Sequence, residues 1–325
     1  MRITVLGAGA WGTALAKTLQ ENGNAVTLWD RDADLLASLQ RGANEKYLAG
    51  VKLPTDWKTQ PDFSKAAGGA ECVVLAIPSQ AFREVTEKLK RHPGIFVSVT
   101  KGIEFETGET MSRILREQAP ADRVVALSGP SFAREVALGI PTSVVCACES
   151  DGTAKIVQGL FHRPEFRIYR NTDILGVEYG GALKNVIAVG AGVGDGLGYG
   201  DNTKAGLVSR ALAEMRRLGV ACGAKPETFN GLSGMGDLML TCFSKQSRNR
   251  DLGERIGKGE TIEQIIASNP KLAEGYPTAK SAHRLAKEKN VPTPIVDEVY
   301  AMLYEGKNPK LAVRDLISRA FKAED

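Results

Sequence analysis

The glycine pattern G-x-G-x-x-G near the start of the chain constrains its fold more than any other feature. It is formed by Gly7, Gly9 and Gly12, after an apolar segment at residues 2–6 and before a helix-type segment at residues 13–20. The first glycine permits a sharp turn, the second lets a pyrophosphate approach the backbone, and the third lets the helix pack close to the strand. The pattern predicts a dinucleotide site at the helix N-terminus. A glycine-rich turn without a ligand is the alternative.

Two charged residues follow the next predicted strand, residues 25–29. Asp30 lies about twenty residues beyond the glycine pattern, where a carboxylate contacts the ribose 2′-hydroxyl of NAD. Arg31 carries a guanidinium that suits the 2′-phosphate of NADP, or it is a solvated charge in a loop. The sequence therefore predicts NAD or NADP as the cofactor and leaves the choice between them open.

Length and composition indicate a globular protein of two domains. The chain has 325 residues, of which 43% are hydrophobic and 25% charged, and its net charge is +4. A charge this small argues against a nucleic-acid partner, and no apolar run is long enough for stable membrane insertion. Five cysteines without a C-x-x-C motif are typical of reduced thiols in a cytoplasmic protein, and the scattered histidines predict no metal site. A strand beginning at residue 2 predicts that no signal peptide is present.

Apolar runs alternate with helical spacing up to about residue 170, which is typical of a doubly wound sheet. We therefore assign residues 1–174 to an α/β Rossmann-type domain with a mostly parallel sheet. The predicted strands are residues 2–6, 25–29, 71–78, 95–99, 123–127, 142–147 and 166–169. Ligands on such sheets bind beyond the carboxyl ends of the strands. The glycine pattern, Asp30-Arg31, Pro78-Ser79, Lys101-Gly102 and Gly129–Ser131 all fall there, and Ser79 is predicted to cap a helix over residues 81–90.

Residues 175–325 show no convincing strand pattern, so we expect an all-helical second domain that binds substrate and carries out catalysis. A long helix over residues 173–193, with Thr172 as a plausible cap, opens this region. The other predicted helices are residues 204–218, 250–256, 262–267, 278–288, 295–304 and 309–321. The glycine-rich run 190–204 predicts that the first helix ends there in a compact turn, or in a loop between packed helices.

Lys184 and Asn185 lie in the middle of this long helix, among small and apolar residues. Gly180 and Gly181 before them each cost about 1 kcal/mol relative to alanine, so close packing or a ligand must compensate. A lysine in apolar surroundings loses its proton more readily and can exchange a proton with an alcohol or carbonyl oxygen. The alternative is a surface lysine beside helix-packing glycines. Asp237, in a later glycine-rich turn, either orients the lysine ammonium or caps a helix.

The segment Ser247-Arg248-Asn249-Arg250 predicts an anion site. Arg248 can donate two N–H groups to one phosphate, and Ser247 and Asn249 add neutral donors near the start of a predicted helix. A solvated basic loop is the alternative.

Six runs together resemble the bacterial type of NAD(P)-dependent glycerol-3-phosphate dehydrogenase, in that family's order. They are GAGAWGTAL at 7–15, TKGIE at 100–104, LSGPSFA at 127–133, GALKN at 181–185, GYGDN at 198–202 and SRNR at 247–250; Glu274-Gly275 matches a family position near the nicotinamide end of the cofactor. The resemblance implies reversible hydride transfer between NAD(P)H and C2 of dihydroxyacetone phosphate, giving sn-glycerol 3-phosphate for phospholipid synthesis. It also implies a homodimer.

The resemblance assigns roles to matched residues. Lys184 is the implied proton acceptor and donor, with Lys101 and Asp237 in the same catalytic site. The implied cofactor contacts are Gly7, Gly9, Ala10, Trp11, Gly12, Asp30, Arg31, Lys101, Ala133, Arg248 and Glu274. The implied substrate contacts are Lys101, Gly129, Ser131, Lys184, Asn185, Asp237, Ser247, Arg248 and Asn249. Two departures from the family pattern, Trp11 and Asp32, leave the packing of the cofactor and a strict preference for NADP open.

Two other functions fit parts of the sequence. A 3-hydroxyacid or phosphogluconate-type dehydrogenase shares the two-domain layout but needs a carboxylate site instead of, or beside, the phosphate site. A non-catalytic dinucleotide sensor would keep the glycine pattern but need not keep Lys184, Asp237 and Arg248 together. An assay with dihydroxyacetone phosphate separates both from the implied enzyme.

Overall fold

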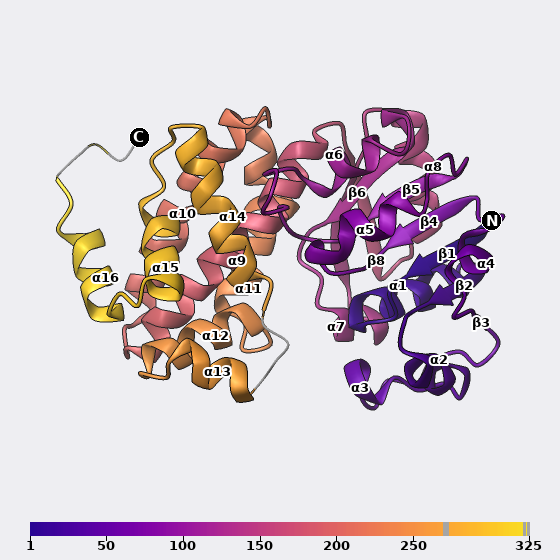
Figure 1. The fold of residues 1–325 in the computed structure, drawn as a ribbon, viewed down its shortest axis with the longest axis horizontal. Helices are drawn as coiled ribbons and strands as arrows, with labels where there is room; N and C mark the ends of the chain where they lie inside the picture. Colours follow the sequence, from indigo (N-terminus) through magenta and orange to yellow (C-terminus); the bar gives the residue numbers. More distant parts are fainter. Residues whose placement is uncertain (269–272, 321–322, 324–325) are drawn as a thin grey trace. The chain divides into compact units, whose positions relative to one another are not determined.

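The computed structural model describes the chain except for residues 269–272, 321–322 and 324–325 (Figure 1). The chain divides into two compact units. Unit 1 comprises residues 1–104 and 109–178, and unit 2 comprises residues 105–108 and 179–325.

Unit 1 is built on an eight-stranded sheet with the order β3-β2-β1-β4-β5-β6-β7-β8. Neighbouring strands are parallel except for β6 and β7, which are antiparallel. The predicted mostly parallel, doubly wound sheet is therefore confirmed. The strands are β1 (Arg2–Leu6), β2 (Ala25–Trp29), β3 (Lys58–Thr59), β4 (Cys72–Leu75), β5 (Ile95–Ser98), β6 (Val124–Ser128), β7 (Thr142–Ala147) and β8 (Phe166–Asn171).

Helices cover both faces of this sheet (Figure 1). They are α1 (Ala10–Glu21), α2 (Ala33–Gln40), α3 (Glu45–Leu48), α4 (Phe63–Ala67), α5 (Phe82–Glu87), α6 (Met111–Arg116), α7 (Ala133–Ala137) and α8 (Asp151–Phe161). Successive residues of β4 pack into the two cores on opposite faces of the sheet. Val74 packs with residues of α1 and α8, whereas Val73 and Leu75 pack with residues of α5 and α6. Burial on both faces explains why such strands appear as uninterrupted apolar runs.

Two details of unit 1 differ from the sequence-based expectation. Ser79 does not cap the following helix: it begins a 3-10 turn, Ser79–Ala81, and α5 starts only at Phe82 without a side-chain cap. In addition, α8 was not predicted from the sequence. Its N-cap residue, Ser150, accepts a hydrogen bond from the backbone N–H of Thr153 at 3.2 Å.

The described residues of unit 2 contain helices and no strand, so the predicted all-helical character is confirmed. The helices are α9 (Ile174–Gly196), α10 (Asp201–Ala221), α11 (Asp237–Phe243), α12 (Arg248–Gly257), α13 (Ile262–Ser268), α14 (Gly275–Glu288), α15 (Pro294–Tyr304) and α16 (Pro309–Ile317). The first residues of α9, up to Glu178, belong to unit 1. Asp173 rather than Thr172 caps α9, because its Oδ1 accepts the Gly176 N–H at 3.0 Å. The predicted last helix ended at residue 321, which lies outside the described residues.

Glycines allow α9 and α12 to pack backbone to backbone. A Cβ at Gly192 of α9 would overlap the carbonyl oxygen of Arg250, and a Cβ at Gly253 of α12 would overlap that of Val189. Gly196 and Gly257 make the same kind of contact one turn further along. The glycine-rich run therefore ends α9 in a turn, as predicted, but the helix continues to Gly196 instead of ending at about residue 193, because Gly192 and Gly196 serve helix packing.

Candidate active site

The glycine loop of unit 1 joins β1 to α1 and leaves room for a ligand. Gly7 has φ +99°, and a Cβ there would overlap the Ala76 carbonyl oxygen, so only glycine fits this turn. A Cβ at Gly12 would overlap the Gly7 carbonyl oxygen, which brings α1 against the strand. Around Gly9, by contrast, no atom lies within 4 Å of where a Cβ would be. The space above Gly9 and the N–H groups of the first turn of α1 suit a pyrophosphate.

Ala10 and Trp11 form the first turn of α1 and are half-buried against the core. The indole Nε1 of Trp11 is buried and has no hydrogen-bond partner within the described chain.

Asp30, at the end of β2, is fixed by two backbone hydrogen bonds. Its Oδ2 accepts the Ala8 N–H at 2.8 Å and its Oδ1 accepts the Asp32 N–H at 3.0 Å. A carboxylate has about four acceptor sites, so these two bonds leave capacity for a ribose hydroxyl. Arg31 is exposed. Asp32 caps α2 by accepting the Leu35 N–H at 3.0 Å, and it pairs with Lys46 at 2.5 Å.

The ends of β5 and β6 bring together the other predicted residues of unit 1. The Lys101 ammonium donates to the Gly129 carbonyl oxygen at 3.0 Å, and the Ser131 hydroxyl donates to the same oxygen at 2.9 Å. Gly129 has φ +133° and packs against Val144, so a side chain would not fit there. Ala133 begins α7 and is half-buried against the core. Lys101 therefore carries a positive charge to the edge where a doubly wound sheet binds its ligands.

In unit 2, Lys184 of α9 is held by two side chains of α11. Its Nζ donates to Asp237 Oδ1 at 2.8 Å and to Thr241 Oγ1 at 2.7 Å. Lys184 is 7% exposed and Asp237 1% exposed, so this is a buried ion pair. Thr241 in turn donates to the Asp237 carbonyl oxygen at 2.6 Å, one turn earlier in the helix. Asp237 thus orients the amine and is also the first residue of α11.

Gly180, the first of the two glycines before Lys184, is explained by close packing. A Cβ at Gly180 would lie 2.5 Å from the Ser233 carbonyl oxygen, in the turn that leads to α11. This approach brings the Lys184 helix within reach of Asp237. Cys242, the residue after Thr241, is a buried thiol, and burial raises its pKa to about 12. A thiol that stays protonated is a poor nucleophile, so we assign no chemistry to Cys242.

The residues predicted to form an anion site lie at the N-terminus of α12. The helix begins at Arg248, two residues earlier than predicted, and Ser247 caps it by accepting the Arg250 N–H at 3.2 Å. Arg248 is exposed, whereas Asn249 is half-buried and donates to Asn185 Oδ1 at 2.9 Å. The N–H groups of the first turn have no acceptor within the helix, which suits an anion. Glu274 is the N-cap residue of α14.

Asp195 is a residue that sequence reasoning missed. Its carboxylate pairs with Lys204 of α10 at 2.6 Å and with Arg250 of α12 at 2.6 Å. All three side chains are at most 13% exposed, so they form a nearly buried charge network that fixes the start of α12. Thr241 was also missed, because a threonine within an amphipathic helix gives no signal in the sequence.

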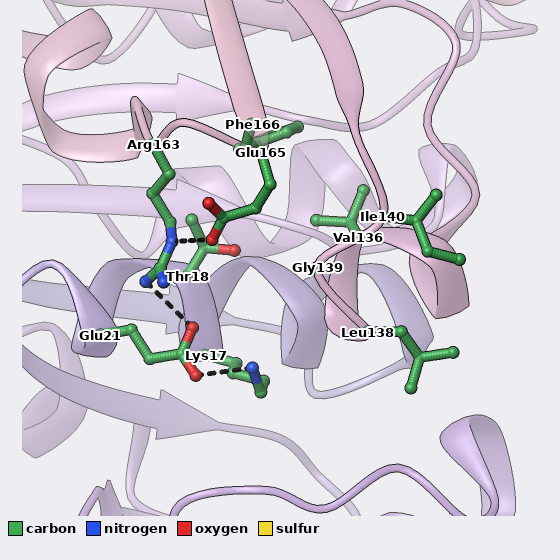
Figure 2. Close-up of a pocket in the computed structure, with 10 residues that line it drawn as sticks. All are labelled: Lys17, Thr18, Glu21, Val136, Leu138, Gly139, Ile140, Arg163, Glu165 and Phe166. Carbon is green, nitrogen blue, oxygen red and sulfur yellow. Dashed lines mark hydrogen bonds and ion pairs between the residues drawn. The ribbon is translucent and has the colours of Figure 1, made fainter.

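A pocket in unit 1, with a volume of ≈ 120 Å³, lies away from these residues. Lys17, Glu21 and Arg163 form one wall, and apolar residues such as Leu138 and Ile140 form the other (Figure 2). Glu21 pairs with both Lys17 and Arg163, at 2.6 and 3.0 Å. Because these charges satisfy one another, the pocket gives no indication of a ligand.

The described part of the chain lacks both a membrane-spanning helix and a cluster of metal-ligand side chains. Across residues 1–268, 273–320 and 323, no helix is long and apolar enough to span a membrane. Over the same residues, no three His, Cys, Asp or Glu side chains form a group that could hold a metal ion.

Comparison with known proteins covers nearly the whole chain. Residues 2–154 match the family model described as NAD-dependent glycerol-3-phosphate dehydrogenase N-terminus, and residues 173–314 match the corresponding C-terminus model. A glycerol-3-phosphate dehydrogenase (NAD(P)+) of Syntrophotalea carbinolica is 48% identical over 331 residues, covering 100% of this chain and 99% of the relative. That of Thermoanaerobacter sp. is 46% identical, with coverages of 100% and 99%.

A solved structure agrees with these matches. The glycerol-3-phosphate dehydrogenase of Coxiella burnetii superposes with a TM-score of 0.93 at 34% identity, covering 98% of this chain and 99% of that one.

Proposed function

Because the chain belongs to the NAD-dependent glycerol-3-phosphate dehydrogenase family, we propose that it interconverts dihydroxyacetone phosphate and sn-glycerol 3-phosphate with NADH or NADPH. The observation that carries this proposal is the buried Lys184–Asp237 pair in a helix-rich unit, within a chain whose other unit presents an open glycine loop. A lysine amine fixed in this way can give a proton to, or take one from, an oxygen at the reacting carbon.

The bound nicotinamide would supply the hydride, and the residues of this chain would do the rest. Lys184, as the ammonium, donates a proton to the C2 oxygen as that oxygen gains negative charge. Asp237 and Thr241 hold the amine in one orientation, which keeps the proton directed at one place. We assign Lys101 the role of adding positive charge beside the same oxygen. Arg248 and the first turn of α12 bind the substrate phosphate.

The cofactor contacts follow the glycine loop. We propose that Gly7, Gly9 and Gly12 accommodate the pyrophosphate, and that Asp30 or Arg31 reads the adenine ribose. Ala10, Trp11, Ala133, Arg248 and Glu274 complete the proposed cofactor contacts. Gly129, Ser131 and Asn185 complete the substrate contacts.

The same family membership supports further proposals. We propose that the protein is a cytoplasmic homodimer and that its reductive direction feeds phospholipid synthesis. The domain boundary proposed between residues 174 and 175 lies four residues before the division between the two compact units, which follows Glu178. Size-exclusion chromatography with light scattering tests the homodimer.

A steady-state assay tests the activity. Oxidation of NADH and NADPH is followed with dihydroxyacetone phosphate, and reduction of both oxidised cofactors is followed with 3-hydroxyacids and 6-phosphogluconate. We expect turnover with dihydroxyacetone phosphate alone. Turnover only with a hydroxyacid would instead assign the chain to the alternative dehydrogenase class, and binding of the cofactor without any turnover would indicate a sensor.

A further inference from the structure

Glu178 is a buried carboxylate to which the proposed reaction gives no role. It lies in the second turn of α9 and is 7% exposed. Its Oε1 accepts the backbone N–H of Ser112 at 2.7 Å, and its Oε2 accepts the hydroxyl group of the same residue. Ser112 is completely buried and lies in the first turn of α6. Both residues belong to unit 1, so this double contact joins the start of α9 to the start of α6.

The carboxylate takes the place of a capping side chain at α6. The first N–H groups of a helix have no acceptor within it, and the side chain just before the helix usually accepts one of them. For the N–H of Ser112 the acceptor is Glu178, 66 positions further along the chain. The hydroxyl of Thr110, the N-cap residue, lies 3.2 Å from that of Ser112 and extends the chain of hydrogen bonds. The start of α6 therefore depends on α9.

The hydrogen bonds of Glu178 offset the cost of burying it and give the contact a direction. Burial raises the pKa of Glu178, while the hydrogen bonds from Ser112 and Thr110 act in the opposite direction. Ile174 and Val177 of α9 pack with α6 residues in the same apolar core, but apolar packing is non-directional. Two hydrogen bonds to one residue instead fix the rotation of α9 and its position along its axis.

A short loop connects Lys101 to this contact. An antiparallel bridge pairs Ile103 with Thr110, so residues 103–110 form a closed loop. The loop begins two residues after Lys101 and ends at the N-cap of α6. Because that N-cap is held through the hydrogen bonds to Glu178, the position of the loop depends on Glu178 as well.

Glu178 also lies where the chain passes from unit 1 to unit 2. It is the last residue of unit 1, and α9 continues without a break to Lys184, six residues or about 9 Å of helix further on. The glycine loop belongs to unit 1, whereas Lys184 and the proposed phosphate-binding turn of α12 belong to unit 2. Turnover needs the groups of both units, but binding of NADH to the glycine loop does not. A fixed start of α9 should therefore matter more for turnover than for binding.

We propose that Glu178 is a positioning residue, which holds the loop after Lys101 and the first turns of the Lys184 helix in one arrangement through its hydrogen bonds to Ser112. This inference rests on the proposed function, because it gives Glu178 a part in that reaction. A displacement of about 1 Å at a reacting group can cost a hundredfold in rate. Loss of the contact should therefore lower kcat by a larger factor than it raises KM.

The first test compares two substitutions of Glu178. Glu178→Met removes both hydrogen bonds at similar size, and we expect kcat with dihydroxyacetone phosphate to fall about tenfold to a hundredfold. The dissociation constant for NADH should stay unchanged, and KM should rise by a smaller factor than kcat falls. Glu178→Gln keeps an oxygen that accepts the Ser112 N–H, so it should retain most of the wild-type kcat. Equal losses of kcat in the two variants, or a loss confined to KM, would contradict the proposal.

A control variant separates positioning from stability. Thr4→Val removes another buried side-chain hydrogen bond of unit 1, which the Thr4 hydroxyl donates to the Ala66 carbonyl oxygen. We expect Thr4→Val to lower the midpoint of urea denaturation and to leave kcat unchanged, whereas Glu178→Met should lower both. If kcat fell as far in Thr4→Val, any loss of stability in unit 1 would slow the reaction, and the role given to Glu178 would be wrong.

Hydrogen exchange tests the contact without turnover, on the chain without cofactor. The Ser112 amide should exchange about tenfold faster in Glu178→Met, because its N–H loses its acceptor, and it should stay protected in Glu178→Gln. Unchanged protection of Ser112 in Glu178→Met would overturn the proposal. Retained protection across β1 and β4 establishes that the variant is folded.

A double-mutant cycle with Ser112→Ala completes the design. If the two side chains act through one contact, the double variant should lose no more kcat than Glu178→Met alone. Losses that multiply would mean that the two side chains act separately, against the proposal. A wild-type chain that does not turn over dihydroxyacetone phosphate would refute the proposed function, whereas the exchange result at Ser112 would still decide whether the contact exists.

Discussion

Lys184 combines burial with positive charge, and this combination is stable only because Asp237 lies 2.8 Å away. We expect Lys184→Met to lower kcat by about 10²- to 10⁴-fold, the usual contribution of an acid–base group, while the dissociation constant for NADH stays unchanged. Removing one partner of a buried ion pair should also cost about 3 kcal/mol of stability, because the Asp237 carboxylate loses its counter-charge. Urea denaturation and fluorescence titration with NADH measure the two effects.

The double variant Lys184→Met/Asp237→Asn separates stability from chemistry. It removes both charges, so most of the lost stability should return while turnover stays low. Near-full turnover in either variant would contradict the role given to Lys184.

Asp30 offers a residue-scale test of cofactor choice. Its carboxylate is held by the Ala8 and Asp32 N–H groups, and a fixed negative charge at this point opposes a 2′-phosphate. Asp30→Asn keeps the shape of the side chain and removes its charge. We expect it to raise the kcat/KM for NADPH, relative to the kcat/KM for NADH, about tenfold, which corresponds to a free-energy difference of about 1.4 kcal/mol. Asp34→Asn, an exposed acid in the first turn of α2, is the matched control. An unchanged ratio would mean that Asp30 does not face the ribose.

At the scale of elements, the glycines of α9 allow a matched pair of variants within one helix. Gly192 packs against the Arg250 carbonyl of α12, whereas a Cβ at Gly194 would meet no atom within 4 Å beyond its chain neighbours and the backbone of α9 itself. Gly192→Ala should push α12 away, cost about 1–3 kcal/mol and raise KM for dihydroxyacetone phosphate, because the phosphate-binding turn moves with α12. Gly194→Ala should stabilise the chain by about 0.5–1 kcal/mol through its higher helix propensity, with KM unchanged. Equal effects of the two variants would show that α9 and α12 do not pack as described.

The same glycines show why sequence reasoning succeeds for some elements and fails for others. Strands such as β4 are apolar on both faces, so the pattern alone identifies them. β3 has two residues, too few for any period, and was not predicted. α9 continues to Gly196 because packing against α12 outweighs the low helix propensity of glycine, and that contact is 50 or more residues away in sequence.

The residues of the candidate site fall into the same two groups: those that the sequence pattern identifies and those that only the fold reveals. The glycine loop carries a local signal, because Gly7, Gly9 and Gly12 all lie in one strand–turn–helix unit at a fixed spacing. The pairing of Lys184 with Asp237 joins residues 53 positions apart, and a sequence cannot distinguish it from helix capping. Thr241 reaches Lys184 and Asp195 reaches Arg250 across more than 50 residues of sequence, so no local motif identifies these two contacts.

At the scale of the whole molecule, Glu214 should make stability depend on pH. Its carboxylate is 1% exposed and accepts the backbone N–H groups of Ile295 and Val296 at the start of α15, at 3.1 and 2.9 Å. Burial raises its pKa to about 7, although these N–H groups act in the opposite direction. The usual value for an unfolded glutamate is 4.5. A raised pKa means that the folded chain binds the proton more tightly than the unfolded chain does.

This contribution is therefore fully present below pH 4.5 and is lost as the pH rises through about 7. From the difference in pKa, the free energy of unfolding should fall by about 3 kcal/mol between pH 4.5 and pH 8 on account of Glu214 alone. Urea denaturation at several pH values measures it in the wild type and in Glu214→Gln, which cannot titrate and should lack this part of the decrease. Glu227→Gln, at an exposed position, is the control. Parallel pH profiles for the wild type and Glu214→Gln would show that Glu214 is already ionised in the folded chain, and that the N–H groups of α15 offset the cost of its burial.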